Sequence, residues 1–264
     1  MPYTPLHLAR FGHGPRTFFG VHGWGSTGTQ SFQELAHFLP PDDVTLLAPD
    51  LPGCGQSPPP PSWDFDLIHQ HLLHTFDTLT ASSSTPITLV GSCSGSFHAL
   101  PLAISRPERI REIVLLEPFA FMPWFFSIFL KPITGYPLYK MVFDNPLGRA
   151  LTRSGLRKQG GDQEKVDMVG NFGQQTDLLA AYEYLRHYGT ITDHTVFKEA
   201  TAPVRIICGE NSFKAIHRSV GLWQQNWPDL TLHELSGIGH MLSQEAPELT
   251  ASLIFQHRES AASS

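Results

Sequence analysis

The segment from Ile87 to Phe97 places a tight turn between a strand and a helix, and it limits the possible folds more than any other part of the chain. Its sequence is Ile-Thr-Leu-Val-Gly-Ser-Cys-Ser-Gly-Ser-Phe. The first four residues are apolar or β-branched, as in a buried strand, and small residues lead into a predicted helix. Glycines two positions before and after Cys93 keep neighbouring backbone from colliding at so sharp a reversal.

This geometry predicts a role for the thiol of Cys93. The side chain at the tip of such a turn projects above the sheet, and the N-terminus of the following helix lies beneath it. The positive end of that helix favours a thiolate and any oxyanion nearby. The alternative is a plain strand-to-helix turn that carries a buried thiol.

Apolar strands and amphipathic helices alternate along much of the chain. Buried strands are predicted at residues 17–21, 45–48, 87–90, 113–117, 204–208 and 230–234. Between two of them, apolar residues step by three or four through Phe65, Ile68, Leu72, Phe76 and Leu79, as in a helix. These strands are mainly apolar and show no period-2 alternation, which is typical of a mostly parallel sheet covered by helices on both faces. The sequence therefore predicts an α/β fold.

Residues 118–201 interrupt this alternation of strands and helices, because they contain no clear strand and begin with many aromatic residues. We interpret them as a helical cap over the sheet edge where the strands end. Residues 1–117 and 202–258 would then form the core, and residues 259–264 a disordered tail. The aromatic run at residues 119–130 has three possible roles: ordinary packing of the cap, a wall for an apolar acyl or ring substrate, or membrane contact. It offers Phe121, Trp124 and Phe125 as candidate substrate-binding residues.

Composition excludes several classes of protein. The net charge of -6 is mild and the basic residues are scattered, so a nucleic-acid partner is rejected. No apolar run reaches the roughly 20 residues that span a bilayer, and the first 16 residues do not resemble a signal peptide, so stable membrane insertion is not expected. Cys54, Cys93 and Cys208 fit neither a disulfide framework nor a zinc site, which indicates a reducing compartment and a cytoplasmic location.

No metal or organic cofactor is expected. His69, His71 and His74 share a predicted helix, but they lack the i, i+4 spacing of a common metal-binding face. We interpret them as part of a solvated helix surface. Of the other cysteines, Cys208 is predicted to fill the core at a strand end, whereas Cys54 lies in a loop at the same sheet edge as Cys93.

Four motifs follow one another in a recognisable order. They are His22-Gly23-Trp24-Gly25, the loop Asp50-Leu51-Pro52-Gly53-Cys54-Gly55-Gln56-Ser57, the turn around Cys93, and Gly237-Ile238-Gly239-His240 followed by Glu245-Ala246-Pro247. Together they resemble the α/β-hydrolase-fold proteins with a helical cap, over nearly the whole chain. The resemblance implies that backbone N–H groups of Trp24 and Ser94 form an oxyanion hole, and that His240 is the catalytic base.

Two positions depart from the family pattern. The nucleophile position holds Cys93 instead of Ser, as in relatives such as the dienelactone hydrolases, and acyl-enzyme chemistry survives this change. The family usually places its acid in a Gly-x-x-Asp turn, where this chain has Ser212, which carries no charge. Glu117 ends the strand after the Cys93 turn and resembles the acid of some haloalkane dehalogenases. It is the first candidate for the catalytic acid, and Glu210 is the second. Alternatively, Glu117 has a structural role, in which it caps the end of its strand or pairs with a residue of the cap.

The sequence thus predicts an esterase or thioesterase for a small apolar substrate. Cys93 would attack the carbonyl with His240 as base, and His240 would then activate water. One alternative is an acyltransferase or cyclase that uses the same thioester intermediate. The other is a binding protein that keeps the fold without catalysis. Neither the substrate nor the oligomeric state follows from the sequence.

Overall fold

A seven-stranded sheet forms the centre of the computed structural model, which describes residues 3–83, 85–148, 150–151, 154 and 177–256. The strand order is β1-β3-β2-β4-β5-β6-β7. The strands are β1 (Leu8–Gly12), β2 (Arg16–Val21), β3 (Val44–Pro49), β4 (Ile87–Ser92), β5 (Ile110–Leu116), β6 (Val204–Gly209) and β7 (Thr231–Leu235). β1 pairs antiparallel with β3, and the other neighbours pair in parallel. The predicted mostly parallel α/β sheet is confirmed.

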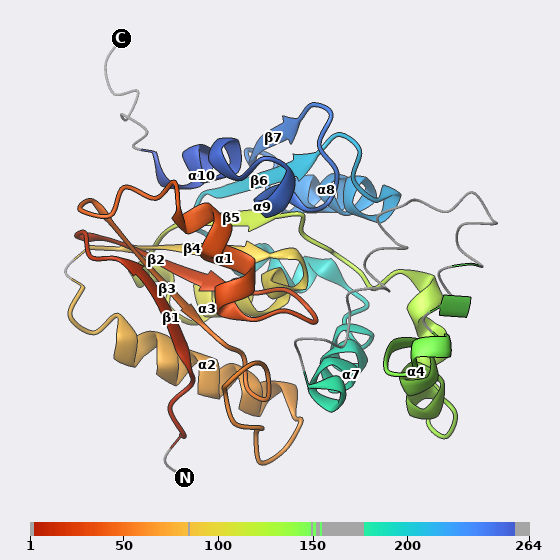
Figure 1. Ribbon diagram of the computed structural model, residues 1–264. Helices are drawn as coiled ribbons and strands as arrows, with labels where there is room; N and C mark the ends of the chain where they lie inside the picture. Colours follow the sequence, from red (N-terminus) through yellow and green to blue (C-terminus); the bar gives the residue numbers. More distant parts are fainter. Residues whose placement is uncertain (1–2, 84, 149, 152–153, 155–176, 257–264) are drawn as a thin grey trace.

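Helices cover both faces of this sheet (Figure 1). One face packs against α1 (Gly28–Ala36), α9 (Leu242–Glu245) and α10 (Pro247–Phe255), and the other against α2 (Phe65–Leu79), α3 (Ser96–Ser105) and α8 (Lys214–Asn226). Successive strand residues point to opposite faces. Leu89 accordingly belongs to one apolar core and Val90 to the other. Because both faces are buried along β2 to β6, these strands show no polar alternation in the sequence.

The antiparallel edge strand β1 was not predicted from the sequence. Of its five residues, Ala9 alone is buried, and Arg10 is exposed. Such a short strand at the edge lacks the continuous apolar run that marks the strands inside the sheet. Its pairing with β3 depends on a contact between distant parts of the chain, which local sequence does not reveal.

The segment between β5 and β6 contributes helical elements among the described residues. These are η3 (Trp124–Leu130), α4 (Gly135–Phe143), α7 (Leu178–Tyr188) and η4 (His194–Glu199), where η denotes a 3-10 helix. Figure 1 shows α4 and α7 on the side of the sheet toward which the parallel strands point. Most of residues 149–176 and the predicted tail at 259–264 lie outside the described residues. The division into core and cap therefore stays a prediction.

The second part of the aromatic run, Trp124–Leu130, forms a 3-10 helix, and the residues before it are not helical. Pro123 stands immediately before the helix, and Lys131 after it already has extended backbone. Phe126 and Phe129 are buried, whereas Trp124 and Ile128 are exposed. The run therefore has one buried and one solvated side.

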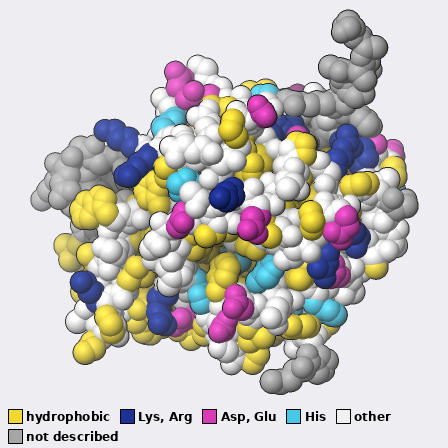
Figure 2. Space-filling view, turned by 180° about the vertical axis from the view of Figure 1, so that it is seen from behind, with side chains coloured by type: hydrophobic (Ala, Val, Ile, Leu, Met, Phe, Trp, Pro, Cys, Tyr) yellow, Lys and Arg dark blue, Asp and Glu magenta, His cyan; other side chains and the backbone are white. Residues whose placement is uncertain are grey.

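Across the described part of the chain, no helix combines the length and the apolar character needed to cross a membrane. On the face drawn in Figure 2, acidic and basic side chains are interspersed with apolar ones.

Candidate active site

Cys93 lies at a strained turn between β4 and α3. A single turn of 3-10 helix, Cys93–Gly95, joins the two elements, and Cys93 has a φ of 54°. Residues other than glycine rarely adopt this left-handed conformation, and strained backbone of this kind clusters at functional sites. A Cβ on Gly95 would collide with the carbonyl of Val21, and one on Gly91 would lie 3.0 Å from the Cα of Ser96. Both glycines are therefore required for the sharp reversal at Cys93.

His240 and Glu117 form a hydrogen-bonded pair at the carboxyl ends of the strands. Nδ1 of His240 donates to Oε2 of Glu117 over 2.9 Å. The backbone N–H of Gly209 donates to Oε1 of Glu117 over 2.6 Å, and the hydroxyl of Ser212 donates to Oε2. Glu117 follows the last residue of β5 and has a φ of 51°. Its buried carboxylate is thus held at both oxygens and directed at the imidazole.

The surroundings of His240 favour its protonated form. Burial lowers the pKa of His240, but side-chain hydrogen bonds to Cys93 and Glu117 outweigh the burial and raise this pKa to about 10. Both partners stabilise the positive charge of an imidazolium. Phe213 packs on one part of the ring at 4.6 Å and Phe119 lies 6.1 Å away, measured between ring centroids. Cys93, His240 and Glu117 are therefore brought together in one row.

The second candidate acid, Glu210, is not brought to His240. Its exposed carboxylate accepts hydrogen bonds from Gly237 N–H and Ser236 Oγ, each over 2.8 Å, and these bonds lower the pKa of Glu210. Ser212, at the position where related proteins have Asp, does reach the pair: its Oγ lies 3.5 Å from Nδ1 of His240. The negative charge beside His240 is that of Glu117.

The two predicted oxyanion-hole residues meet beside Cys93. A Cβ on Gly23 would lie 3.0 Å from the Cβ of Cys93, so the loop that carries Trp24 passes directly over the thiol. The backbone N–H of Trp24 donates to the hydroxyl of Ser94 over 2.8 Å. Sequence analysis assigned a role to the backbone of Ser94 but not to its side chain. No sequence signal indicates this contact.

His22 shapes the loop that carries Trp24. Its Nε2 accepts the N–H of Leu51, and its Nδ1 donates to the carbonyl of Gly23, each over 2.9 Å. An imidazole can accept at one nitrogen and donate at the other only when it is neutral. Burial lowers the pKa of His22 and so favours that neutral form.

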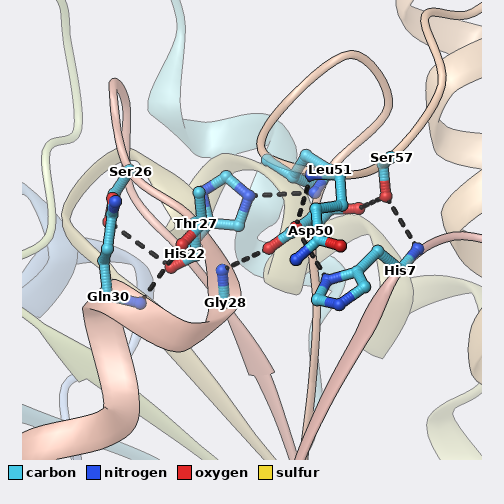
Figure 3. Close-up of polar contacts among 10 residues, drawn as sticks. His7, His22, Ser26, Thr27, Gly28, Gln30, Asp50, Leu51 and Ser57 are labelled. Atoms are coloured by element: carbon cyan, nitrogen blue, oxygen red, sulfur yellow. Dashed lines mark hydrogen bonds and ion pairs between the residues drawn. The ribbon is translucent and has the colours of Figure 1, made fainter. Parts of the chain in front are cut away.

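Asp50 connects three further segments around this loop, as Figure 3 shows. Its carboxylate accepts from Gly28 N–H at the start of α1 over 2.8 Å and from Gln56 N–H over 3.0 Å, and it pairs with Nδ1 of His7 at 3.0 Å. The side chain is buried. Sequence analysis used Asp50 only as part of a motif, and its structural role appears once these distant segments are brought together.

All three cysteines lie within the described residues, and they differ sharply in surroundings. Cys54 and Cys208 are buried, whereas Cys93 is partly exposed. Burial raises the pKa of Cys208 to about 12 and that of Cys54 still higher. Both thiols are therefore protonated at neutral pH. Cys208 fills the core at the end of β6, as predicted.

The structure describes the side chains of two of the three predicted substrate-binding aromatics. Phe121 is half-buried, and the guanidinium carbon of Arg218 lies 4.9 Å from its ring centroid. Trp124 is 82% exposed. The substrate-binding role of these residues stays a prediction. The side chain of Phe125 lies outside the described residues.

The predicted solvated surface of three histidines is wrong for one of them. His71 is buried, and its Nε2 lies 2.6 Å from the carbonyl oxygen of Thr4. The N-terminal segment covers this part of α2, a contact that helical spacing alone does not reveal. Within the described residues, no group of three or more His, Cys, Asp or Glu side chains is placed to hold a metal ion.

Comparisons with known proteins agree with this architecture. Uncharacterized hydrolase YugF of Bacillus subtilis (strain 168) is 26% identical over 250 residues, which cover 89% of this chain and 87% of YugF. Lipase LipV of Mycobacterium tuberculosis is 34% identical over 114 residues, but this match covers 43% of the chain and only 41% of LipV.

Solved structures with little sequence identity share the fold. A lipase-esterase related protein from Clostridium acetobutylicum ATCC 824 superposes with a TM-score of 0.70 at 21% identity. The superposition covers 96% of this chain and 100% of the Clostridium protein. A thermophilic esterase from Thermogutta terrifontis gives a TM-score of 0.72 at 16% identity, with 94% and 91% covered. The sequence also matches the alpha/beta hydrolase family over residues 18–253. The mostly parallel sheet and this match over most of the sequence lead to one conclusion: the chain belongs to the alpha/beta hydrolase family.

Proposed function

We propose that this protein hydrolyses carboxylic esters or thioesters through an acyl-enzyme on Cys93. The observation that carries the proposal is the row formed by Cys93, His240 and Glu117, in which the imidazole is hydrogen-bonded to Glu117 and both partners raise its pKa. Family membership supports a hydrolase, and a lipase is among the similar proteins. The row supplies a nucleophile, a proton carrier and an orienting carboxylate, which acyl transfer requires.

In the first half of the reaction, the thiolate of Cys93 attacks the carbonyl carbon of the substrate. A carbon–sulfur bond forms, and the carbonyl oxygen becomes an oxyanion. Backbone N–H groups of Ser94 and Trp24 stabilise this charge. When the intermediate collapses, the bond to the leaving alcohol or thiol breaks, and the imidazolium of His240 gives that group its proton.

In the second half, neutral His240 takes a proton from a water molecule, and the resulting hydroxide attacks the thioester. Collapse of the second intermediate releases the carboxylic acid and returns Cys93 as a thiolate beside a protonated His240. Glu117 accepts the Nδ1–H bond throughout, so that Nε2 faces the reacting groups and the imidazolium is stabilised. Each cycle consumes one water and leaves the enzyme unchanged.

The preferred substrate in this proposal has an apolar acyl or ring part. Phe119 and Phe213 flank His240, and aromatic residues dominate the nearby helical segment that we assign to a cap over residues 118–201. Apolar groups gain from burial against such side chains. The three free cysteines fit a reducing compartment, and we place the enzyme in the cytoplasm.

The test is to trap the acyl-enzyme. After the protein is mixed with p-nitrophenyl butyrate and quenched in acid, intact mass should increase by one butyryl group, and peptide mapping should place that group on Cys93. Cys93→Ala should abolish both the adduct and turnover. A butyryl group on Cys54 or Cys208, or full turnover by Cys93→Ala, would exclude the proposed mechanism.

The same assay separates the alternatives. An acyltransferase would pass the butyryl group to an added amine or thiol faster than to water, because a thioester reacts readily with both. A non-catalytic binding protein would give neither adduct nor turnover with esters of any chain length.

A further inference from the structure

We propose that the hydroxyl of Ser94 governs the oxyanion hole by holding the Trp24 N–H until negative charge develops on the substrate oxygen. This inference rests on the proposed function of Cys93. It assigns Ser94 a positioning role through its side chain, in addition to the role of its backbone N–H.

The proposal is based on competition between two acceptors, Oγ of Ser94 and the carbonyl oxygen of the substrate, for the backbone N–H of Trp24. The Trp24 N–H is one of the two donors of the proposed oxyanion hole, and in this structure it donates to Oγ of Ser94 over 2.8 Å. Ser94 is 3% exposed, so water does not readily replace its hydroxyl as the partner. A carbonyl oxygen that enters the site must therefore compete with Ser94 for this donor.

Trp24 cannot shift easily to relieve this competition. Its indole N–H donates to the carbonyl of Ala181 on α7 over 2.7 Å. The ring also makes edge-to-face contacts with Phe126 at 5.4 Å and Phe143 at 5.8 Å between centroids. Because the residue is fixed through its side chain, the hydroxyl of Ser94 is the part that must move, by rotation about a single side-chain bond.

Neutral groups surround Ser94 on its buried side. Its hydroxyl lies near Tyr188, whose Oη is 3.1 Å from Nε2 of His98. Tyr188 and His98 are both buried. Burial raises the pKa of Tyr188 and lowers that of His98 to about 3, helped by neighbouring histidines, so both are neutral at pH 7. The bond between Ser94 and Trp24 is therefore a hydrogen bond between neutral groups.

The relative strength of hydrogen bonds then decides when the amide is released. A neutral ester carbonyl gains about as much from the Trp24 N–H as the Ser94 hydroxyl loses, so substrate binding alone does not displace Ser94. A hydrogen bond to an oxyanion is about twice as strong as a neutral one, which is enough to displace it. The donor thus reaches the substrate oxygen in the transition state and not in the ground state, so Ser94 weakens ground-state binding without changing the height of the barrier from the bound complex.

The Ser94→Ala variant tests this order of events. Without the hydroxyl, the neutral substrate also gains the Trp24 N–H, and the transition state gains equally. We expect the half-saturation concentration for the acylation burst with p-nitrophenyl butyrate to fall about two- to tenfold, the factor for one neutral hydrogen bond, while the maximal rate changes less than about twofold. Tyr188→Phe, which changes the buried surroundings of Ser94 but keeps its hydroxyl, should lower the half-saturation concentration less.

The matched control is Ser96→Ala, because Ser96 donates its hydroxyl to the carbonyl of Cys93 over 2.7 Å and lies in the same turn. The half-saturation concentration for the acylation burst should not fall in this control. A tenfold or larger loss of kcat/KM in Ser94→Ala, with an unchanged Tm, would show that the hydroxyl is itself an oxyanion donor and would overturn the proposal. An unchanged half-saturation concentration would overturn it as well.

A second measurement does not depend on catalysis. Labelling with ¹⁵N-tryptophan gives few backbone amide signals, because the chain contains 5 tryptophans, and Trp24→Phe identifies the signal of interest. That signal should shift in Ser94→Ala and stay in place in Ser96→Ala. If it does not shift, the Ser94 contact is refuted even when Cys93 is catalytic. If it shifts while Cys93→Ala keeps full turnover, the proposed function fails and the Ser94 contact has no catalytic role.

Discussion

Cys93 differs from the other two cysteines in exposure, backbone conformation and neighbours. It is partly exposed in the 3-10 turn before α3 and raises the pKa of His240, whereas Cys54 and Cys208 are buried thiols with raised pKa values. The thiolate is the reactive form of cysteine, so these surroundings favour Cys93. We expect iodoacetamide at pH 7 to alkylate Cys93 at least about tenfold faster than the other two.

The measurement is peptide mass spectrometry over a time course of alkylation. Cys93→Ser should remove the fast phase and leave the slow modification of Cys54 and Cys208 unchanged. If Cys54 is modified first, the Cys93 turn is not the reactive centre.

Glu117 is expected to orient His240 for both proton transfers. Glu117→Gln removes the negative charge beside Nδ1 but keeps the size of the side chain. Loss of the acid costs up to about 10⁴ in turnover in serine enzymes of this type, and we expect a smaller loss here because a thiolate depends less on a strong base. Steady-state assays with p-nitrophenyl butyrate measure the effect.

Glu210→Gln is the matched control for Glu117→Gln. The exposed carboxylate of Glu210 bonds to Ser236 and Gly237, away from His240, so turnover should stay near that of the parent protein. Adding Ser212→Asp to Glu117→Gln places a new carboxylate close to Nδ1 and should restore part of the activity. A greater loss in Glu210→Gln than in Glu117→Gln would transfer the role of acid to Glu210.

Among the elements, the loops around the site are held together by Asp50. Three donors from separate segments converge on this buried carboxylate: Gly28 N–H, Gln56 N–H and His7 Nδ1. Asp50→Asn leaves a side-chain amide whose own N–H group faces some of these donors. We expect the variant to lose about 2–3 kcal/mol of unfolding free energy, the range for a broken hydrogen bond to a buried charged group.

Urea unfolding followed by circular dichroism measures this loss. Asp42→Asn is the control, because Asp42 pairs with His13 at the surface, where their side chains are 92% and 70% exposed. A surface ion pair of this kind contributes about 0–1 kcal/mol, so the control should unfold near the parent midpoint. Equal losses in both variants would mean that Asp50 does not organise the loops.

The interior elements could be predicted from sequence because their signals are local. The apolar runs of β2 to β6 and the glycines around Cys93 each lie within a few residues of the feature that they specify. Glu117 could be proposed because it directly follows the strand after Cys93, and the structure places it 2.9 Å from His240. The elements that escaped prediction, β1 and the 3-10 form of the aromatic run, lack a continuous or periodic local pattern.

The side-chain network of the site could not be predicted, because it joins residues far apart in the chain. The hydroxyl of Ser94 meets the backbone of Trp24, and Tyr188 of α7 reaches both Ser94 and His98. None of these residue types at these positions signals a partner in advance. Exposure of Trp124 likewise depends on which side of η3 the fold buries, and composition cannot decide that.

At the scale of the whole molecule, the site should make stability depend on pH. In the folded protein, His240 keeps its proton to about pH 10, whereas its ordinary pKa is 6.5. Between these values the folded state binds more protons than the unfolded state, so the free energy of unfolding decreases as pH rises. The contribution of His240 is fully present below pH 6.5 and is lost by about pH 10.

The pH series compares the parent protein with His240→Gln, so that tyrosines, lysines and the buried thiols, which titrate in both proteins, cancel. The unfolded thiol of Cys93 keeps its proton up to about pH 8.5, whereas the proposed folded pair of Cys93 and His240 holds one proton between them. The difference in unfolding free energy should therefore shrink mainly between about pH 8.5 and pH 10, with a slope of at most about 1.4 kcal/mol per pH unit. Glu117→Gln removes one of the two partners that raise the pKa of His240, and should flatten the pH dependence of the parent. Urea midpoints at half-unit steps of pH provide the data. A difference between the parent and His240→Gln that stays constant across this range would show that His240 is not held as an imidazolium, and the first proton transfer of the proposed mechanism would then need another donor.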